Sequence, residues 1–405
     1  MILKKPDFLS LKDFNYSLPE DKIAKYPVEK RDHSKLLVYK DDLIFNSEFK
    51  YLPKYIPEGA HLVFNETKVI HARLIFRKKS GAKIEIFCLE PIHPGDYQLN
   101  FSSRNKVVWK CLIGNLKKWK AEKLEYITDQ GYTLYARKIE SSDYSNQVEF
   151  SWDSDNISFS EIIEEVGSTP IPPYLNRLAE ESDSENYQTV YSRNEGSVAA
   201  PTAGLHFTIE VMENLRAKQV QETFLTLHVG AGTFVPVKSE NAIDHTMHIE
   251  RIYVQKSAIQ NLISNYSFII PVGTTSCRTL ESLYWFGVKL LTGKFDEDFP
   301  LLEQWEAHNL SSHFSRKEAL KAIIDYLEET NSDIFSAATG IMITPGYDFQ
   351  MTDALITNFH QPSSTLLMLI SSLTGDSWKD IYNYALSNDF RFLSYGDSSI
   401  LFPSI

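Results

Sequence analysis

The stretch TIEVMENLRAKQVQETFLTLHVG, residues 208–230, decides the fold class of this chain. Its first half repeats apolar residues at the spacing of an amphipathic helix behind Thr208, whose hydroxyl can cap that helix. Its second half, from Glu222, is a short apolar run in which aliphatic residues alternate with Thr226 and His228, as in a strand. A helix followed directly by a strand is typical of an α/β domain.

The same succession continues toward the C-terminus. Three more strands are predicted at SFIIPVG (267–273), GIMIT (340–344) and ALITNF (354–359). Two helices are predicted: TLESLYWFGVKLL (279–291), with Thr275 or Ser276 at its start, and STLLMLISSLTG (364–375), capped by Ser363 or Ser364. Near the N-terminus, LLVY (36–39) and HLVF (61–64) predict strands of the same body. The segment 296–336 has helical spacing in EALKAIIDYLEE, and we expect a surface elaboration there.

A different pattern occupies the region between about Glu66 and Phe150. Short alternating runs such as AKIEIFCL (82–89) are broken by Gly, Asn and Asp, which predicts a small antiparallel β module. Residues 66–123 carry thirteen Lys and Arg against five Asp and Glu, a net charge of +8, whereas the whole chain carries −12. We predict a basic module, residues 66–150, inserted into a discontinuous α/β body of residues 1–65 and 151–405. A lysine face that only aids solubility is the alternative.

The composition excludes several classes of protein. The three cysteines, Cys88, Cys111 and Cys277, form no C-x-x-C pair, so neither a disulfide framework nor a cysteine zinc site is indicated. The N-terminus lacks the apolar core of a signal peptide, and no apolar run is long enough to span a membrane. No Walker A sequence occurs, so nucleoside triphosphate binding is unsupported. We expect a soluble, cytoplasmic monomer without membrane contact.

Small residues form the densest candidate site. The run from Gly196 to Gly204 lets backbone approach a flat ligand closely, and it contains Thr202. His206 follows where this loop meets the next helix. A tightly packed turn is the alternative interpretation.

His228 lies at the C-terminal end of its predicted strand, the usual ligand edge of an α/β sheet. The flexible Gly230 and Gly232 follow it, without the helix that a dinucleotide fingerprint requires. A histidine packed in the core is the alternative. In HTMHIE (245–250), His248 and Glu250 suit hydrogen bonding or acid and base chemistry better than an incomplete metal set.

Three further loops carry polar residues. Gly273–Arg278 follows a strand and opens a helix, so the free N–H groups near Thr274 and Thr275, together with the Arg278 guanidinium, favour an anion. Ordinary helix capping is the alternative. Two more candidate sets are Asn358, Phe359 and His360, for a nucleobase, and Arg391, Tyr395 and Asp397, which we expect after an aromatic strand.

Nine blocks, in order, resemble the S-adenosylmethionine:tRNA ribosyltransferase-isomerase family over most of the chain. They are FNETKVIHARL (64–74), PIPPYLNR (170–177), YQTVYSRNEGSVAAPTAGLHF (187–207), TLHVGAGTFVPV (226–237), HTMHIE (245–250), VGTTSCRTLES (272–282), ITPGYDF (343–349), TNFHQPSSTLLML (357–369) and RFLSYGDS (391–398). The resemblance implies a barrel-like α/β body with an inserted small antiparallel β-barrel. It also implies transfer of the ribosyl part of S-adenosylmethionine to 7-aminomethyl-7-deazaguanine at the tRNA wobble position. Adenine and methionine leave, the product is epoxyqueuosine, and S-adenosylmethionine is a co-substrate without a permanently bound cofactor.

The implied reaction needs proton transfer, because the sulfonium acidifies the adjacent sugar C–H and the leaving adenine must be protonated. The predicted catalytic residues are His206, His228, His248 and Glu250, and which histidine is the base stays open. The predicted substrate-binding residues are Thr202, Gly204, Gly230, Gly232, Thr274, Thr275, Arg278, Asn358, Phe359, His360, Arg391, Tyr395 and Asp397. The predicted tRNA-binding residues are Lys68, Arg73, Lys78, Lys79, Lys117 and Lys118, and no metal is expected.

The chain departs from the family pattern at Glu66, Lys68 and His71, where Asp, Arg and Pro are usual, and the segment 296–336 is longer than in typical members. Lysine at position 68 cannot make the bidentate contact of arginine. Two other functions therefore stay open: an S-adenosylmethionine-dependent enzyme of this fold with another nucleobase acceptor, and a non-catalytic RNA-binding protein.

Overall fold

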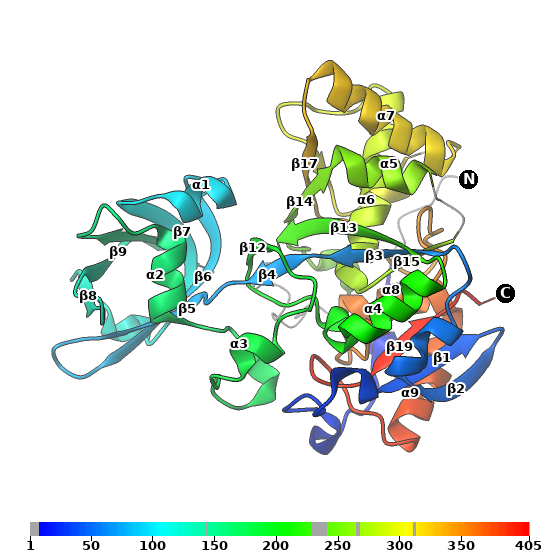
Figure 1. Ribbon diagram of the computed structural model, residues 1–405, viewed down its shortest axis with the longest axis horizontal. Helices are drawn as coiled ribbons and strands as arrows, with labels where there is room; N and C mark the ends of the chain where they lie inside the picture. The colour runs from blue at the N-terminus through cyan, green and yellow to red at the C-terminus, as the bar shows by residue number, and fades with distance from the viewer. Residues whose placement is uncertain are drawn as a thin grey trace.

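The computed structural model describes residues 8–120, 122–141, 145–228, 241–264, 268–310 and 313–404, with Ser141 and His228 described through their backbones alone. It is a mixed α/β protein with curled sheets (Figure 1). A small β-rich part lies at one side of the molecule, and a larger part that contains most of the helices lies at the other (Figure 1). No helix among these residues is long and apolar enough to cross a membrane.

The larger part contains a six-stranded mixed sheet. Its strands, in spatial order, are β15 (Ile269–Pro271), β3 (His61–Asn65), β13 (Gln221–His228), β14 (Glu250–Gln255), β17 (Ile334–Thr339) and β16 (Leu301–Leu302). The first three strands run parallel, and β14 is antiparallel to both of its neighbours. The predicted strand that follows the Thr208 helix is therefore confirmed as β13.

A four-stranded sheet lies beside the first one. Its order is β18 (Leu355–Asn358), β19 (Ser398–Leu401), β1 (Lys35–Lys40) and β2 (Leu43–Glu48). A parallel bridge between Val272 and Ile356 joins the two sheets, and the N–H of Gly273 donates to the carbonyl of Ile356 at 2.8 Å. The carboxyl ends of β15 and β18 consequently meet at one place.

Helices cover this body: α4 (Ile209–Ala217), α5 (Lys256–Ser264), α6 (Thr274–Leu291), α7 (Arg316–Glu329), α8 (Thr365–Thr374) and α9 (Trp378–Ser387). The predicted caps at Thr208 and Ser364 are confirmed, because each side chain accepts a hydrogen bond from the third helical N–H. Helix α6 is buried on all sides from Ser276 to Lys289, although this stretch contains the charged residues Arg278, Glu281 and Lys289.

The smaller part is a seven-stranded antiparallel sheet. Its order is β11 (Gly167–Ser168), β5 (Arg73–Arg77), β6 (Lys83–His93), β7 (Lys106–Gly114), β10 (Asn146–Trp152), β9 (Thr133–Ser141) and β8 (Leu124–Ile127). The sheet curls until the rings of Phe76 on β5 and Tyr126 on β8 lie 6.3 Å apart. Helices α1 (Tyr97–Ser102) and α2 (Phe159–Val166) contribute to a core around Trp109.

Two short strands, β4 (Thr67–Val69) and β12 (Asn194–Ser197), pair where the two parts meet, and the short helix α3 (Asp183–Asn186) lies close by (Figure 1). The sheet of the smaller part extends to Ser168, beyond residue 150. The assignment of residues 66–150 to an inserted domain stays a prediction.

Three local predictions were wrong. Residues 340–344 form no strand, because Gly340 and Met342 donate to the carbonyls of Leu302 and Gln304 as single contacts after β17 has ended. Helix α6 begins at Thr274 rather than at Thr275 or Ser276, because Gly273 turns the chain at φ +91°. No strand precedes Arg391, since Phe392 makes an isolated bridge alone and β19 starts later.

The segment 296–336 does more than cover the surface. Its α7 packs an apolar face into the core through Ala319, Leu320 and Ile323, and its β16 joins the main sheet as the edge strand next to β17. The predicted helical spacing in this segment is confirmed by α7.

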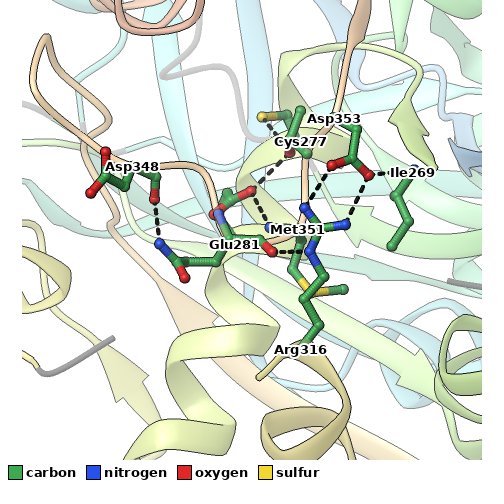
Figure 2. A network of polar contacts seen from close by, with 9 residues as sticks. Ile269, Cys277, Glu281, Arg316, Asp348, Met351 and Asp353 are labelled. Atoms are coloured by element: carbon green, nitrogen blue, oxygen red, sulfur yellow. Dashed lines mark hydrogen bonds and ion pairs between the residues drawn. The ribbon is translucent and has the colours of Figure 1, made fainter. Parts of the chain in front are cut away.

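A buried carboxylate joins α6 to the loop before β18 (Figure 2). Glu281 is fully buried, and each of its oxygens accepts two hydrogen bonds: from the Tyr347 hydroxyl and Gln350 N–H at 2.9 and 2.8 Å, and from Met351 N–H and the Thr352 hydroxyl at 3.0 and 2.9 Å. Burial raises the pKa of Glu281, and these four donors oppose the shift. Four donors and no acceptor favour the ionised form.

We predict that Glu281→Gln lowers the free energy of unfolding by roughly 2–4 kcal/mol, because the new amide nitrogen faces donors and leaves them unpaired. Chemical denaturation at neutral pH measures this. Glu329→Gln, at the exposed end of α7, is the matched control and should change the same quantity by less than about 0.5 kcal/mol. Equal stability of both variants would contradict the role given to Glu281.

Candidate active site

A cavity of about 380 Å³ opens where the ends of β15 and β18 meet. The small-residue loop before α4, the segment before β14, the start of α8 and the loops that contain Tyr174 and Ser394 also line it. Nine of the predicted site residues line it: Thr202, His248, Glu250, Thr274, Thr275, Arg278, Asn358, Phe359 and His360. The volume falls in the range of small-molecule sites.

The first turn of α6 forms the anion-attracting side of the cavity. Gly273, Thr274 and Thr275 line it, so the first N–H groups of α6 and the positive end of its dipole face the cavity. The helix is 18 residues long. The Ser276 hydroxyl instead donates back to the Val272 carbonyl at 2.9 Å, which ties the turn to the preceding strand.

Arg278 and Glu250 form a buried ion pair in this wall. Arg278 Nη1 donates to Glu250 Oε2 at 2.5 Å, and Nε donates to the carbonyl of Ile341 at 3.2 Å. Nη2 of Arg278 is buried and has no hydrogen-bond partner among the residues that the structure describes. An unsatisfied guanidinium nitrogen is costly inside a protein, so a ligand acceptor fits this position.

His206 lies behind the cavity, in a chain of hydrogen bonds that ends inside it. The Asn358 amide donates to His206 Nε2 at 3.0 Å, so Nδ1 carries the proton and donates to the Ser34 hydroxyl at 2.7 Å. The Asn358 oxygen in turn accepts from the Thr202 hydroxyl at 3.0 Å. Burial, with help from nearby Arg391, lowers the pKa of His206 to about 3, so the ring is neutral at physiological pH.

The other cavity histidines differ in exposure. His248 is exposed at the cavity wall, whereas burial, followed by the charge of His248, lowers the pKa of His245. Burial lowers the pKa of His360 to about 4, and its Nε2 lies 3.0 Å from the Thr357 hydroxyl. Of the predicted catalytic histidines whose side chains the structure describes, His248 is therefore the one that is open to a ligand in the cavity.

Known proteins similar to this chain agree on one family. The family described as queuosine biosynthesis protein matches residues 11–401. The chain belongs to this family. Proteins named S-adenosylmethionine:tRNA ribosyltransferase-isomerase from Acetivibrio thermocellus and Thermosipho melanesiensis are 38% and 37% identical to it, over 97% of this chain and 100% of theirs. A solved S-adenosylmethionine tRNA ribosyltransferase from Thermotoga maritima aligns with 96% of this chain and 99% of its own at 26% identity, with a TM-score of 0.45.

Four residues that the queuosine-family blocks suggested lie away from the cavity. A Cβ on Gly204 would lie 1.9 Å from the Tyr191 hydroxyl, so close packing requires glycine there. Arg391 and Asp397 pair at 3.2 Å, and Tyr395 donates to Asp183 at 2.7 Å. A second cavity of about 20 Å³ is lined by His206, Arg391 and Tyr395. Phe359 lines the main cavity, but its ring packs against Phe390 and Phe392 with centroids 5.6 and 4.9 Å away.

Some predicted residues are not described, and others were missed. Gly230, Gly232 and the side chain of His228 lie outside the described residues. Tyr174 and Tyr187 line the cavity, and the Tyr187 hydroxyl is buried without a partner in the described part of the chain. Both tyrosines belong to family-like blocks, but two aromatic residues in a loop carry no local sign of a site.

The predicted tRNA-binding cations fall into two groups. Lys68 pairs with Glu195 at 3.0 Å, Arg73 with Glu85 at 2.9 Å, and Lys78 with Glu122. Lys79, Lys117 and Lys118 are exposed and have no ion pair with a described residue. Within the described ranges, no group of three His, Cys, Asp or Glu side chains could hold a metal ion.

The family departures at Glu66, Lys68 and His71 lie outside the lining of the cavity, at β4 and its flanks. Glu66 is buried and accepts from the Asn194 amide at 3.2 Å, and burial raises its pKa. His71 Nδ1 lies 3.3 Å from the Glu164 carbonyl in α2. These changes therefore affect the junction of the two parts.

We predict that His206 makes the protein less stable in mild acid. Its pKa lies well below the ordinary value near 6.5, so the unfolded chain binds the extra proton, and stability that is complete above about pH 6.5 falls as the pH drops toward 3. The slope should reach about 1.4 kcal/mol per pH unit. His206→Gln, which keeps a donor and an acceptor, should remove that share of the slope in denaturation curves at pH 7, 6 and 5. An unchanged slope would show that His206 titrates normally.

Proposed function

We propose that the cavity binds S-adenosylmethionine and is where its ribosyl group is transferred and isomerised onto a tRNA base. Family membership and the full-length relatives support an S-adenosylmethionine:tRNA ribosyltransferase-isomerase. The observation that carries the assignment of the site is Nη2 of Arg278, which has no partner among the described residues and lies beside the first turn of α6. These groups suit the carboxylate of the methionine part, because a helix N-terminus and a guanidinium both attract an anion.

His248 is the proposed proton-transfer residue. It is exposed to the cavity, whereas both nitrogens of the neutral His206 are engaged by Ser34 and Asn358. Glu250 is held by Arg278 in an ion pair, so we assign it to orienting the guanidinium rather than to donating a proton. His206 then acts through Asn358 as a positioning residue.

Asn358 and Thr202 suit the nucleobase end of the ligand. The Asn358 amide is fixed by His206 on one side and by the Thr202 hydroxyl on the other, so its orientation is set before a ligand arrives. A fixed amide can hydrogen bond to the edge of adenine or deazaguanine. The neutral ring of His360 adds another group of this kind.

The proposed chemistry follows from the sulfonium. A base removes the acidified sugar proton, the ring opens, and adenine leaves with a proton from an acid. The aminomethyl group of 7-aminomethyl-7-deazaguanine, at the tRNA wobble position, then attacks as the neutral amine. Methionine departs when the sugar oxygen closes the epoxide, which gives epoxyqueuosine. The residues named here bind the ends of the donor and move protons, and no permanently bound cofactor is required.

The curled sheet of β5 to β11 is the proposed tRNA-binding module, an inserted small β-barrel domain. Lys79, Lys117 and Lys118 supply exposed positive charge there, in a chain whose net charge is −12. We further propose that the protein acts as a monomer in the cytoplasm, where its tRNA substrate occurs.

We predict that the protein, incubated with S-adenosylmethionine and tRNA carrying 7-aminomethyl-7-deazaguanine, releases adenine and methionine. Arg278→Lys should raise KM for S-adenosylmethionine by about 10- to 100-fold, because lysine keeps the charge near Glu250 but loses the second nitrogen. Product chromatography and initial rates measure both results.

The matched control is Arg177→Lys, since Arg177 also pairs with a carboxylate, that of Asp183, at 2.6 and 2.7 Å, but does not line the cavity. It should lower the melting temperature and leave KM unchanged. Release of S-adenosylhomocysteine would indicate methyl transfer instead, and no turnover with tRNA binding intact would indicate a plain RNA-binding protein.

We predict that replacing Lys79, Lys117 and Lys118 by Ala weakens tRNA binding by about 10-fold or more at physiological salt. The slope of log affinity against log salt concentration should also decrease by the equivalent of up to about three phosphate contacts. Binding of S-adenosylmethionine should not change. The control replaces Lys317, Lys321 and Lys379, which are exposed on α7 and α9. Filter binding at several salt concentrations compares the two proteins, and equal tRNA affinities would move the RNA surface away from the module.

A further inference from the structure

Gln304 lies outside the cavity and binds the backbone of a segment that lines it. Its Nε2 donates to the carbonyl of His245 at 2.8 Å, and its Oε1 accepts from the N–H of Met247 at 2.9 Å. A residue in a parallel strand makes the same pair of contacts with its neighbour: its N–H donates to one carbonyl, and its C=O accepts from the N–H two residues further along. The side-chain amide of Gln304 therefore takes the place of a neighbouring strand.

The bound segment has little other backbone support. It lies between the 3₁₀ turn Ala242–Asp244 and the start of β14 at Glu250, and it belongs to neither. In the part of the chain that the structure describes, residues 246–248 take part in no backbone–backbone hydrogen bond of a turn or loop. Yet His245, Met247 and His248 all line the cavity. The N–H of His245 donates to the Ala242 carbonyl at 3.2 Å, and beyond it the Gln304 amide is the support of this backbone that the described residues provide.

Gln304 is itself well fixed. It follows β16, whose Leu302 is fully buried, and its carbonyl accepts from the Met342 N–H at 3.1 Å. Its Nε2 also contacts Met342 Sδ at 3.2 Å, which orients the amide. The next turn, Glu306–His308, is anchored by the buried Ala307 and by His308, whose Nε2 lies 3.1 Å from the Met342 carbonyl. A rigid base thus presents a fixed donor and acceptor.

We propose that Gln304 is a positioning residue that holds the His245–Met247 backbone against the cavity, so that His248 and Glu250 meet the substrate in a fixed geometry. The segment 296–336 then supports the reaction from behind the site, although none of its described residues lines the cavity. The kinetic consequences rest on the function proposed above, whereas the backbone contact does not.

The test compares Gln304→Met, which has a similar length and no amide, with Glu303→Ala, an exposed neighbour as matched control. Amide hydrogen exchange of Met247, measured without substrates, should become about 10-fold faster in Gln304→Met, because its acceptor is gone. The same variant should raise KM for S-adenosylmethionine or lower kcat by about 10-fold at a nearly unchanged melting temperature. The control should change none of these quantities.

Gln304→Glu decides the matter if the first variant does not fold. It keeps an acceptor for the Met247 N–H and loses the donor to His245, so Met247 exchange should stay slow while turnover falls. Its carboxylate should also raise the pKa of His245 in an NMR titration, because a nearby negative charge favours the protonated ring. Unchanged exchange in Gln304→Met, or faster exchange with unchanged kinetics, would overturn the proposal. Slow wild-type exchange without release of adenine would instead reject the proposed reaction and leave the backbone contact in place.

Discussion

The carboxylate of Glu281 is the constraint on which the rest of the body depends. It is fully buried in α6 and accepts four hydrogen bonds from the loop that leads into β18. Asp353, at the end of that loop, is held by Arg316 of α7 and accepts from the N–H of Ile269 at 2.8 Å. One short loop is thus tied to α6, α7 and β15 together (Figure 2). Because a buried charge without partners costs several kcal/mol, the loop and the helix are fixed relative to each other.

This constraint sets the geometry of the cavity. Arg278 lies nearly one turn before Glu281 on the same helix, and Asn358 ends the strand that the tethered loop enters. The bridge between Val272 and Ile356 then brings the start of α6 beside the end of β18. A guanidinium and an amide from distant parts of the sequence consequently face one cavity without either being placed by a flexible loop.

Local patterns were enough to predict much of the body, and long-range contacts explain what they could not. The helix cap at Thr208 and the alternation in β13 depend on neighbouring residues, so both were predictable. The run GIMIT has the composition of a strand, but it makes only two separate backbone hydrogen bonds with β16 and Gln304 among the described residues, and these form no ladder. Composition alone cannot reveal this. His206 was predicted to be a proton carrier because histidine titrates near neutrality. Its partner Ser34 is 172 residues away, so its neutral, fully bonded state was invisible in the sequence.

Glu281 and Glu250 also show how a structural buried charge differs from one that serves a site. Each oxygen of Glu281 accepts two hydrogen bonds from protein donors, so the carboxylate is fully satisfied without a ligand. Among the described residues, Glu250 has a single charged partner, Arg278, and Nη2 of Arg278 is buried there without an acceptor. A fully satisfied charge stabilises one arrangement of the chain. A pair with an unused buried donor carries a desolvation penalty, and a ligand that accepts a hydrogen bond from that donor removes it. The unused hydrogen-bond donor of Arg278, rather than burial or charge, is what distinguishes the Arg278–Glu250 pair from the structural carboxylate of Glu281.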